Sequence, residues 1–88
     1  MVTVHIPAVL RTMTLGDTLV RMEAANVREV VEQLEVRYPG IRQRLCDGDR
    51  LKPGLAVAID SRIHSRGLLE PLSPGCEVHF LPAVSGGV

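Results

Sequence analysis

The 88-residue chain has the size of one small domain, which would bury roughly 60–65% of its unfolded surface. Its 45% hydrophobic and 23% charged residues indicate a folded globular protein rather than a disordered one. Ten basic and ten acidic residues cancel, which argues against a basic nucleic-acid-binding face. No apolar run approaches the roughly 20 residues of a membrane span, and no signal peptide opens the chain. We therefore expect a cytoplasmic protein without nucleic-acid or membrane partners.

The first two predicted elements form a β-hairpin. Residues 2–6 alternate apolar and polar side chains, the pattern of a strand with one buried face. Pro7 then limits further pairing because it has no N–H group to donate. Residues 18–22 follow a turn signal at residues 15–17 and predict the second arm of the hairpin.

A helix is predicted next. Asn26 and Glu29 have the spacing of a capping box, in which each side chain reaches the other residue's backbone N–H. The apolar residues that follow recur at helical spacing and predict one buried stripe: Val27, Val30, Val31, Leu34 and Tyr38. Residues 39–40, Pro-Gly, end the helix. Ile41 and Leu45 indicate one more short helical turn, followed by a loop around residues 47–49.

The second half of the chain contains strands and turns. Residues 55–59 are apolar enough for a well-buried strand, and residues 60–62 predict a tight turn into a short strand around Ile63. Residues 73–76, Ser-Pro-Gly-Cys, have proline and glycine where a type II turn requires them. Residues 77–81 alternate again and predict a final strand.

The order of elements indicates an α+β fold. The first and last strands can pair as parallel central neighbours, because the intervening helix permits a crossover. One helix covers only one face of a sheet, so the other face is left partly open. We predict a β-grasp, or ubiquitin-like, fold: a mixed sheet of four to five strands with one main helix packed on one face.

The side chains form no convincing catalytic constellation, so we predict that the protein is not itself an enzyme. His5 and His79 fall at outward strand positions and could lie close together on the open sheet face. A metal site there needs a further ligand that the sequence does not identify, so we interpret them as solvent-facing histidines and predict no metal site. Cys46 and Cys76 are interpreted as ordinary reduced thiols.

The last eight residues carry the most specific pattern, Leu-Pro-Ala-Val-Ser-Gly-Gly-Val. A terminal Gly-Gly alone is more often a frayed end without a role. Here it directly follows the final strand of a predicted ubiquitin-like fold. We therefore divide the chain into a β-grasp domain, residues 1–82, and a flexible C-terminal tail, residues 83–88, that carries Gly86 and Gly87.

These residues resemble a known family. The stretch L-x-P-G-x-E-V-x-F-L-P-A-V-S-G-G, residues 72–87, is similar to the C-terminal signature of the MoaD/ThiS family of ubiquitin-like sulfur carriers. The opening V-T-V-x-I-P-x-x-L-R, residues 2–11, fits the first strand of the same family. The segment L-E-V-R-Y-P-G-I-R-Q-R-L, residues 34–45, looks most like the family's carrier for thiocarboxylate-dependent cysteine synthesis.

The resemblance implies a carrier chemistry at the C-terminus. An adenylating enzyme uses ATP to activate the Gly87 carboxylate, and sulfur displaces AMP to leave a thiocarboxylate. This group donates sulfur to an acceptor enzyme in cofactor biosynthesis, for molybdopterin or thiamine, or in cysteine biosynthesis. The carrier itself needs no bound cofactor. Gly86 and Gly87 lack Cβ atoms and can thread a narrow channel. The candidate partner contacts are Leu81, Pro82, Ala83 and Val84.

One residue departs from the pattern in a way that matters. Active carriers of the family end at the second glycine, whereas Val88 follows Gly87 here. A β-branched residue at that point would put a bulky Cβ at the reacting carbonyl. We interpret the chain as a precursor from which a peptidase removes Val88, since the rest of the motif is intact. Loss of carrier activity is the alternative.

Three other functions stay open. The chain could be the small subunit of molybdopterin synthase, whose tail inserts into the large subunit and which differs from a free carrier only in the acceptor. It could be a protein modifier that is conjugated through Gly87 to lysines of other proteins. It could also be a plain β-grasp interaction module with an incidental tail. We rank the free sulfur carrier first and the others in this order.

Overall fold

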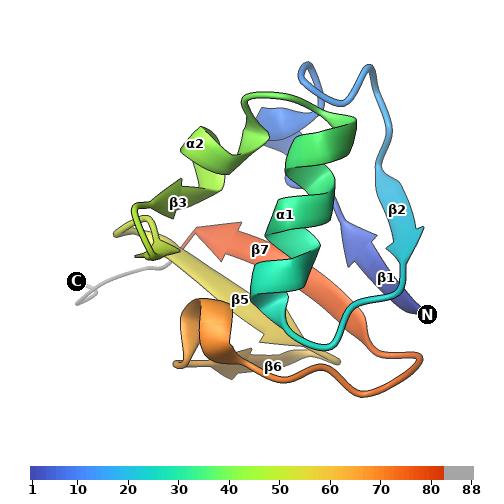
Figure 1. Cartoon of the computed structure of the whole chain (residues 1–88), viewed down its shortest axis with the longest axis vertical. Helices are drawn as coiled ribbons and strands as arrows, with labels where there is room; N and C mark the ends of the chain where they lie inside the picture. The colour runs from blue at the N-terminus through green and yellow to red at the C-terminus, as the bar shows by residue number, and fades with distance from the viewer. Residues whose placement is uncertain (83–88) are drawn as a thin grey trace.

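The computed structural model describes residues 1–82 of the chain (Figure 1). A five-stranded mixed sheet has the strand order β2-β1-β7-β5-β6. Its strands are β1 (Val2–His5), β2 (Leu19–Met22), β5 (Leu55–Ile59), β6 (Arg62–His64) and β7 (Glu77–Pro82). The helices are α1 (Val27–Arg37) and α2 (Ile41–Leu45). The predicted α+β class and the mixed sheet are confirmed.

The two central strands, β1 and β7, run parallel, with Val4 opposite Val78. The chain between them includes α1, which provides the crossover that parallel neighbours require. β1 and β2 form the predicted antiparallel hairpin, with Val4 opposite Val20. β7 pairs antiparallel with β5 on its other side, so the last strand lies between the first strand and the middle of the chain.

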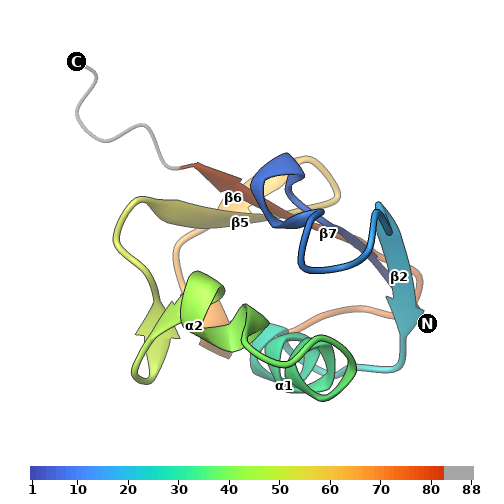
Figure 2. The same cartoon turned by 90° about the horizontal axis from the view of Figure 1, so that it is seen from above.

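The helical layer covers one face of the sheet, as the view from above shows (Figure 2). The predicted apolar stripe of α1 is buried, and it packs against the alternate strand residues that point to the same side. The sheet's share of this core comes from β1, β2, β5 and β7: Val2, Val4, Val20, Met22, Val57, Val78 and Phe80. The core is therefore almost entirely aliphatic, with Phe80 and Tyr38 as its two aromatic side chains.

The start of α1 is capped nearly as predicted. The Asn26 side chain accepts a hydrogen bond from the Glu29 N–H at 2.9 Å. The Glu29 carboxylate accepts its bond from the Ala25 N–H at 2.9 Å, one residue before the donor that a capping box uses. The Asn26 and Glu29 side chains therefore each accept a backbone N–H, and these two hydrogen bonds fix where the helix begins.

A second cap joins α1 to α2. Gly40 has a φ of +100°, a left-handed conformation that suits glycine, and it precedes the first residue of α2. The Glu35 carboxylate accepts hydrogen bonds from the backbone N–H groups of Gly40 and Arg42, at 2.9 and 2.8 Å. These two bonds hold the pKa of Glu35 below its usual value. Glu35 is therefore a structural cap between the two helices.

Some local structure was not predicted. The expected loop at residues 47–49 is the turn of a small hairpin between β3 (Cys46–Asp47) and β4 (Arg50–Leu51). Two short 3₁₀ helices, Ala8–Leu10 and Gly67–Leu69, add one buried leucine each to the core. Such segments are too short to show a hydrophobic period. Across residues 1–82, no helix is both long and apolar enough to cross a membrane.

Candidate functional site

The end of β7 is the site from which the predicted tail continues. Val78 and Phe80 point into the core, whereas Leu81 is half-buried and Pro82 is exposed. Leu81 lies opposite Ala56 in the neighbouring strand, and Pro82 lies opposite Leu55. Pairing with β5 therefore continues to the last described residue, so the base of the tail is fixed to the sheet.

Most of the predicted site lies outside the described residues. This applies to Ala83, Val84, Gly86, Gly87 and Val88. Their roles in threading, charging and processing stay predictions, as does the boundary between a domain and a flexible tail. Of the predicted partner contacts, only Leu81 and Pro82 belong to the part of the chain that the structure describes.

An apolar hollow of about 430 Å³ adjoins this strand end. Its lining includes Pro7, Leu10, Leu55, Phe80 and Pro82. Two basic residues, Arg44 and Lys52, also contribute to it. A surface of this kind, apolar with basic groups, is suited to contact with another protein.

The open face of the sheet has its own row of aligned side chains. The register places Leu19, His5, His79, Ala58 and Ile63 side by side across all five strands. Leu19 and Ile63 are 51% and 70% exposed, so apolar side chains flank the two histidines without being covered. Leu81 lies two residues beyond His79 on the same face.

The two histidines are in contact, as the sequence suggested they could be. Their rings stack with centroids 3.8 Å apart and planes 9° from parallel. Partial burial, together with the neighbouring His5, lowers the pKa of His79 below its usual value. They are not two independent solvent-facing side chains, and the interpretation of them as such needs this correction.

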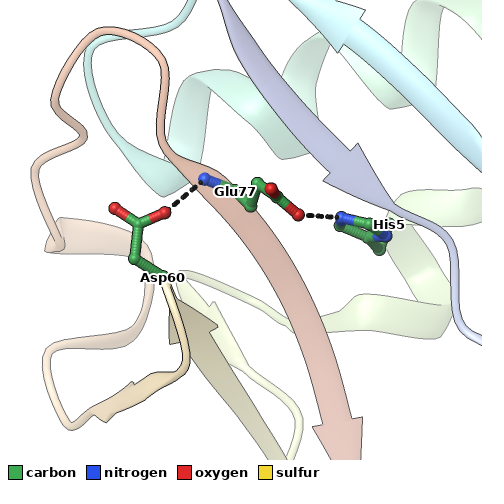
Figure 3. Close-up of polar contacts among 3 residues, drawn as sticks. All are labelled: His5, Asp60 and Glu77. Carbon is green, nitrogen blue, oxygen red and sulfur yellow. Dashed lines mark hydrogen bonds and ion pairs between the residues drawn. The ribbon is translucent and has the colours of Figure 1, made fainter.

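Glu77 completes a three-residue cluster that sequence reasoning missed. Its carboxylate lies 2.7 Å from Nε2 of His5 (Figure 3). The signal was present in the sequence, since Glu77 and His79 are two residues apart in a strand and must share a face. Parallel pairing of the first and last strands was predicted, but the register that brings the Glu77 carboxylate to His5 was not.

Burial governs both cysteines, although Arg42 near Cys46 acts in the opposite direction and lowers the pKa of that thiol. Cys46 and Cys76 are both buried and both free. Burial is the main cause that raises the pKa of each thiol. A raised pKa keeps a thiol protonated and unreactive at neutral pH, which favours the interpretation of both as ordinary reduced cysteines.

A mixed sheet with parallel central strands and one helix across one face is the β-grasp arrangement, which defines the protein as ubiquitin-like. Residues 4–87 match the ThiS family. The chain therefore belongs to the ThiS family.

Curated relatives support the same class. The chain is 36% identical over 93 residues to the sulfur carrier protein CysO of Mycobacterium tuberculosis strain H37Rv, with 98% of each chain covered. It is 34% identical over 65 residues to small archaeal modifier protein 3 of Haloferax volcanii, with 72% of this chain and 71% of that one covered. The family match and the CysO similarity together support a ubiquitin-like sulfur carrier.

Solved structures agree with the fold over nearly the whole chain. A crystal structure of the BexX/CysO complex of Amycolatopsis orientalis contains a chain that superposes with a TM-score of 0.87 and is 36% identical, with 99% of this chain and 100% of that one covered. Crystalline CysO of M. tuberculosis gives a TM-score of 0.84 at 32% identity, covering 96% and 100%.

Proposed function

We propose that this protein carries sulfur as a thiocarboxylate on Gly87 and delivers it to an acceptor enzyme of the cysteine-synthase type. The observation that carries the proposal is the near full-length similarity to CysO at 36% identity, together with the Gly-Gly pair that follows the last strand. The chain acts as a co-substrate, and no residue of it catalyses a reaction in this scheme.

The charging chemistry requires a free carboxylate on Gly87. That carboxylate attacks the α-phosphorus of ATP on an adenylating enzyme, which releases pyrophosphate and forms an acyl adenylate. Sulfide, or an equivalent sulfur nucleophile, then attacks the acyl carbon, and AMP leaves. The product is the thiocarboxylate, and ATP is bound by the activating enzyme alone. The need for ATP places this step, and hence the protein, in the cytoplasm under the proposal.

Val88 must be removed before this chemistry can begin. The Gly87 carbonyl is otherwise held in a peptide bond, which has no carboxylate oxygen to attack ATP. A peptidase that hydrolyses the Gly87–Val88 bond supplies the missing carboxylate. The absence of Cβ atoms at Gly86 and Gly87 suits a cleavage site and an activation site that both approach the backbone closely.

The partner enzymes need a surface that fixes the domain while the tail reacts. Leu81, Pro82 and the adjoining apolar hollow meet this need, because they adjoin the point where the tail continues. The BexX/CysO complex is a precedent for a relative that assembles with a second protein. Docking there offsets the conformational entropy that a Gly-Gly tail loses when it is ordered.

Intact mass spectrometry of the untagged protein from its native cells tests the proposal. We expect a species that ends at Gly87, with a fraction in which one oxygen is exchanged for sulfur. With the cognate activating enzyme and ATP in vitro, a chain that ends at Gly87 should be charged. A Gly87→Ala variant of it should react far more slowly. If the Gly87→Ala variant delivers sulfur as well as the parent chain, the carrier proposal is wrong and an interaction module is favoured.

Conjugation to other proteins is a second candidate, favoured by the similarity to a small archaeal modifier protein. It would use the same activated Gly87, with a lysine amine in place of sulfide as the nucleophile. Lys52 is the sole lysine of this chain, so modifier chains could grow only through it. Gly87 remnants on lysines of other cellular proteins, found by peptide mass spectrometry, would support this role over sulfur delivery.

A further inference from the structure

The open face of the sheet carries a set of metal-ligand side chains that the carrier chemistry does not use. His5, Glu77 and His79 each offer one ligand atom, and these three atoms lie within 4.8 Å of one another. Two imidazoles and one carboxylate are a donor set that proteins use for zinc and neighbouring divalent metals. We infer that His5, Glu77 and His79 form a binding site for a divalent transition-metal ion, with Zn²⁺ as the best match.

The backbone holds these ligands in place. His5 and His79 are directly opposed in the parallel β1–β7 ladder, at the centre of the sheet. Glu77 lies on the same face of β7 as His79. Its backbone is clamped to the β5–β6 turn, because Glu77 N–H donates to the Asp60 carboxylate at 2.9 Å and Asp60 N–H donates to the Glu77 carbonyl at 3.0 Å (Figure 3). Sites on central strands are more rigid than sites on loops.

The ligand atoms are close enough to hold one ion once the two histidine rings leave their stack. A tetrahedral zinc ion with bonds of about 2.0–2.1 Å to nitrogen separates its ligand atoms by about 3.4 Å. Imidazole binds a metal ion in the plane of its ring, so the stacked rings of His5 and His79, now 9° from parallel, must first turn away from each other. Rotation of this kind brings atoms that are at most 4.8 Å apart to the required distance. The ion would take the place of the present contact between His5 Nε2 and the Glu77 carboxylate, and the carboxylate charge would partly neutralise it.

The site is also accessible. The His5 and Glu77 side chains are 30% and 56% exposed, so an ion can enter from solvent without unfolding the domain. Three protein ligands leave a fourth tetrahedral position for water or for a group from a partner. Imidazole nitrogens favour zinc over magnesium or calcium, which prefer sites built of oxygen atoms alone.

The chain offers a matched control. His64 also lies near a carboxylate, with Nδ1 3.3 Å from Glu70. Within residues 1–82, however, this pair belongs to no group of three metal-ligand side chains. A His64→Ala variant therefore removes a histidine and an ion pair without touching the proposed site.

Isothermal titration of untagged, metal-stripped full-length protein with ZnCl₂ tests the inference. We expect one ion per chain, and affinity at least about ten-fold weaker in His5→Ala and in His79→Ala, but unchanged in His64→Ala. Circular dichroism would confirm that each variant is folded, with Glu77→Gln as a milder replacement if one is not. In NMR spectra, zinc should shift the ring resonances of His5 and His79 and leave those of His64 in place.

Two results would overturn the inference of a metal site. One is the absence of zinc binding by the folded parent protein. The other is binding that survives unchanged when His5 and His79 are replaced together, since the ion would then be held elsewhere. Neither result bears on Gly87, so the carrier proposal would stand or fall separately.

Discussion

The two faces of the central strand β7 differ in what their side chains do. Val78 and Phe80 point toward α1 and are almost completely buried. Glu77, His79 and Leu81 alternate with them on the other side, where they are exposed or half-buried. Neighbouring residues in one strand therefore serve different purposes, one set holding the fold and the other facing solvent and partners.

The difference shows how a domain of this size can complete its core and still present an open surface. The helical layer closes only one face, so the core is completed there and the opposite face stays available. Within residues 1–82 the apolar side chains on the open face, such as Leu19 and Ile63, are exposed and add little to stability, so they are available for burial by a partner. The predictions below separate the two faces by experiment.

The largest effect is expected from Phe80→Ala. Phe80 is 3% exposed, and removal of a buried aromatic ring leaves a cavity in the aliphatic core. Truncations of this kind cost about 3–5 kcal/mol, a large share of the stability of a small domain. The neighbouring Leu81→Ala removes a half-buried side chain from the open face and should cost about 1 kcal/mol or less. Urea denaturation followed by circular dichroism measures the free energy of unfolding of both variants. Equal losses of stability would show that the two faces of β7 do not differ in their contribution to the fold.

For charging by the activating enzyme, Leu81 on the open face should matter more than its small contribution to stability suggests. Leu81→Ala should lower the kcat/KM of charging by the activating enzyme about ten-fold, equivalent to about 1.4 kcal/mol of lost binding. Val36→Ala is the control, because Val36 is an apolar residue that is 85% exposed on α1. It should charge like the parent protein. If both substitutions slow charging equally, contact with Leu81 is not specific.

A smaller loss of stability is expected on the helical side from Asn26→Ala. The variant loses the side-chain oxygen that caps the Glu29 N–H, a change that costs about 1 kcal/mol. Asn26→Asp retains an acceptor at the same place and should keep most of the stability. Both variants should be charged at the parent rate, since the cap lies in the helical layer. A charging defect in folded Asn26→Ala would show that the two layers are coupled.

The sequence predicted the fold well because its signals were local. The capping residues and the apolar stripe defined α1, and alternation defined β1 and β7. The hairpin β3–β4 escaped prediction because two-residue strands have no measurable period. The turn at Asp60 and Ser61 was predicted as tight, and both residues adopt positive φ angles, the conformation of a type I′ hairpin turn.

The candidate sites were predictable only in part. The Gly-Gly pair and Leu81 lie within one short stretch, residues 81–87, so a sequence motif reveals them. The histidine cluster joins residues 72 positions apart, since His5 meets Glu77 only through the parallel pairing of β1 with β7. The topology could be predicted, but register is a property of packing, and a shift of one residue would send His79 to the other face.

The smallest expected effect is a pH dependence on the helical side. The pKa of Glu35 is lowered because its carboxylate accepts the N–H groups of Gly40 and Arg42, so the folded state favours the ionised form. A lowered folded-state pKa gives stability that is present above the unfolded pKa, near 4.5, and lost as the pH falls through the folded value. Glu35→Gln keeps an acceptor without the titrating charge and should flatten this part of the stability curve. Thermal melts at pH 6, 5, 4 and 3 compare the two proteins. The gap in Tm between parent and variant should narrow as the pH falls, and a gap that is constant with pH would mean that Glu35 contributes through packing rather than through charge.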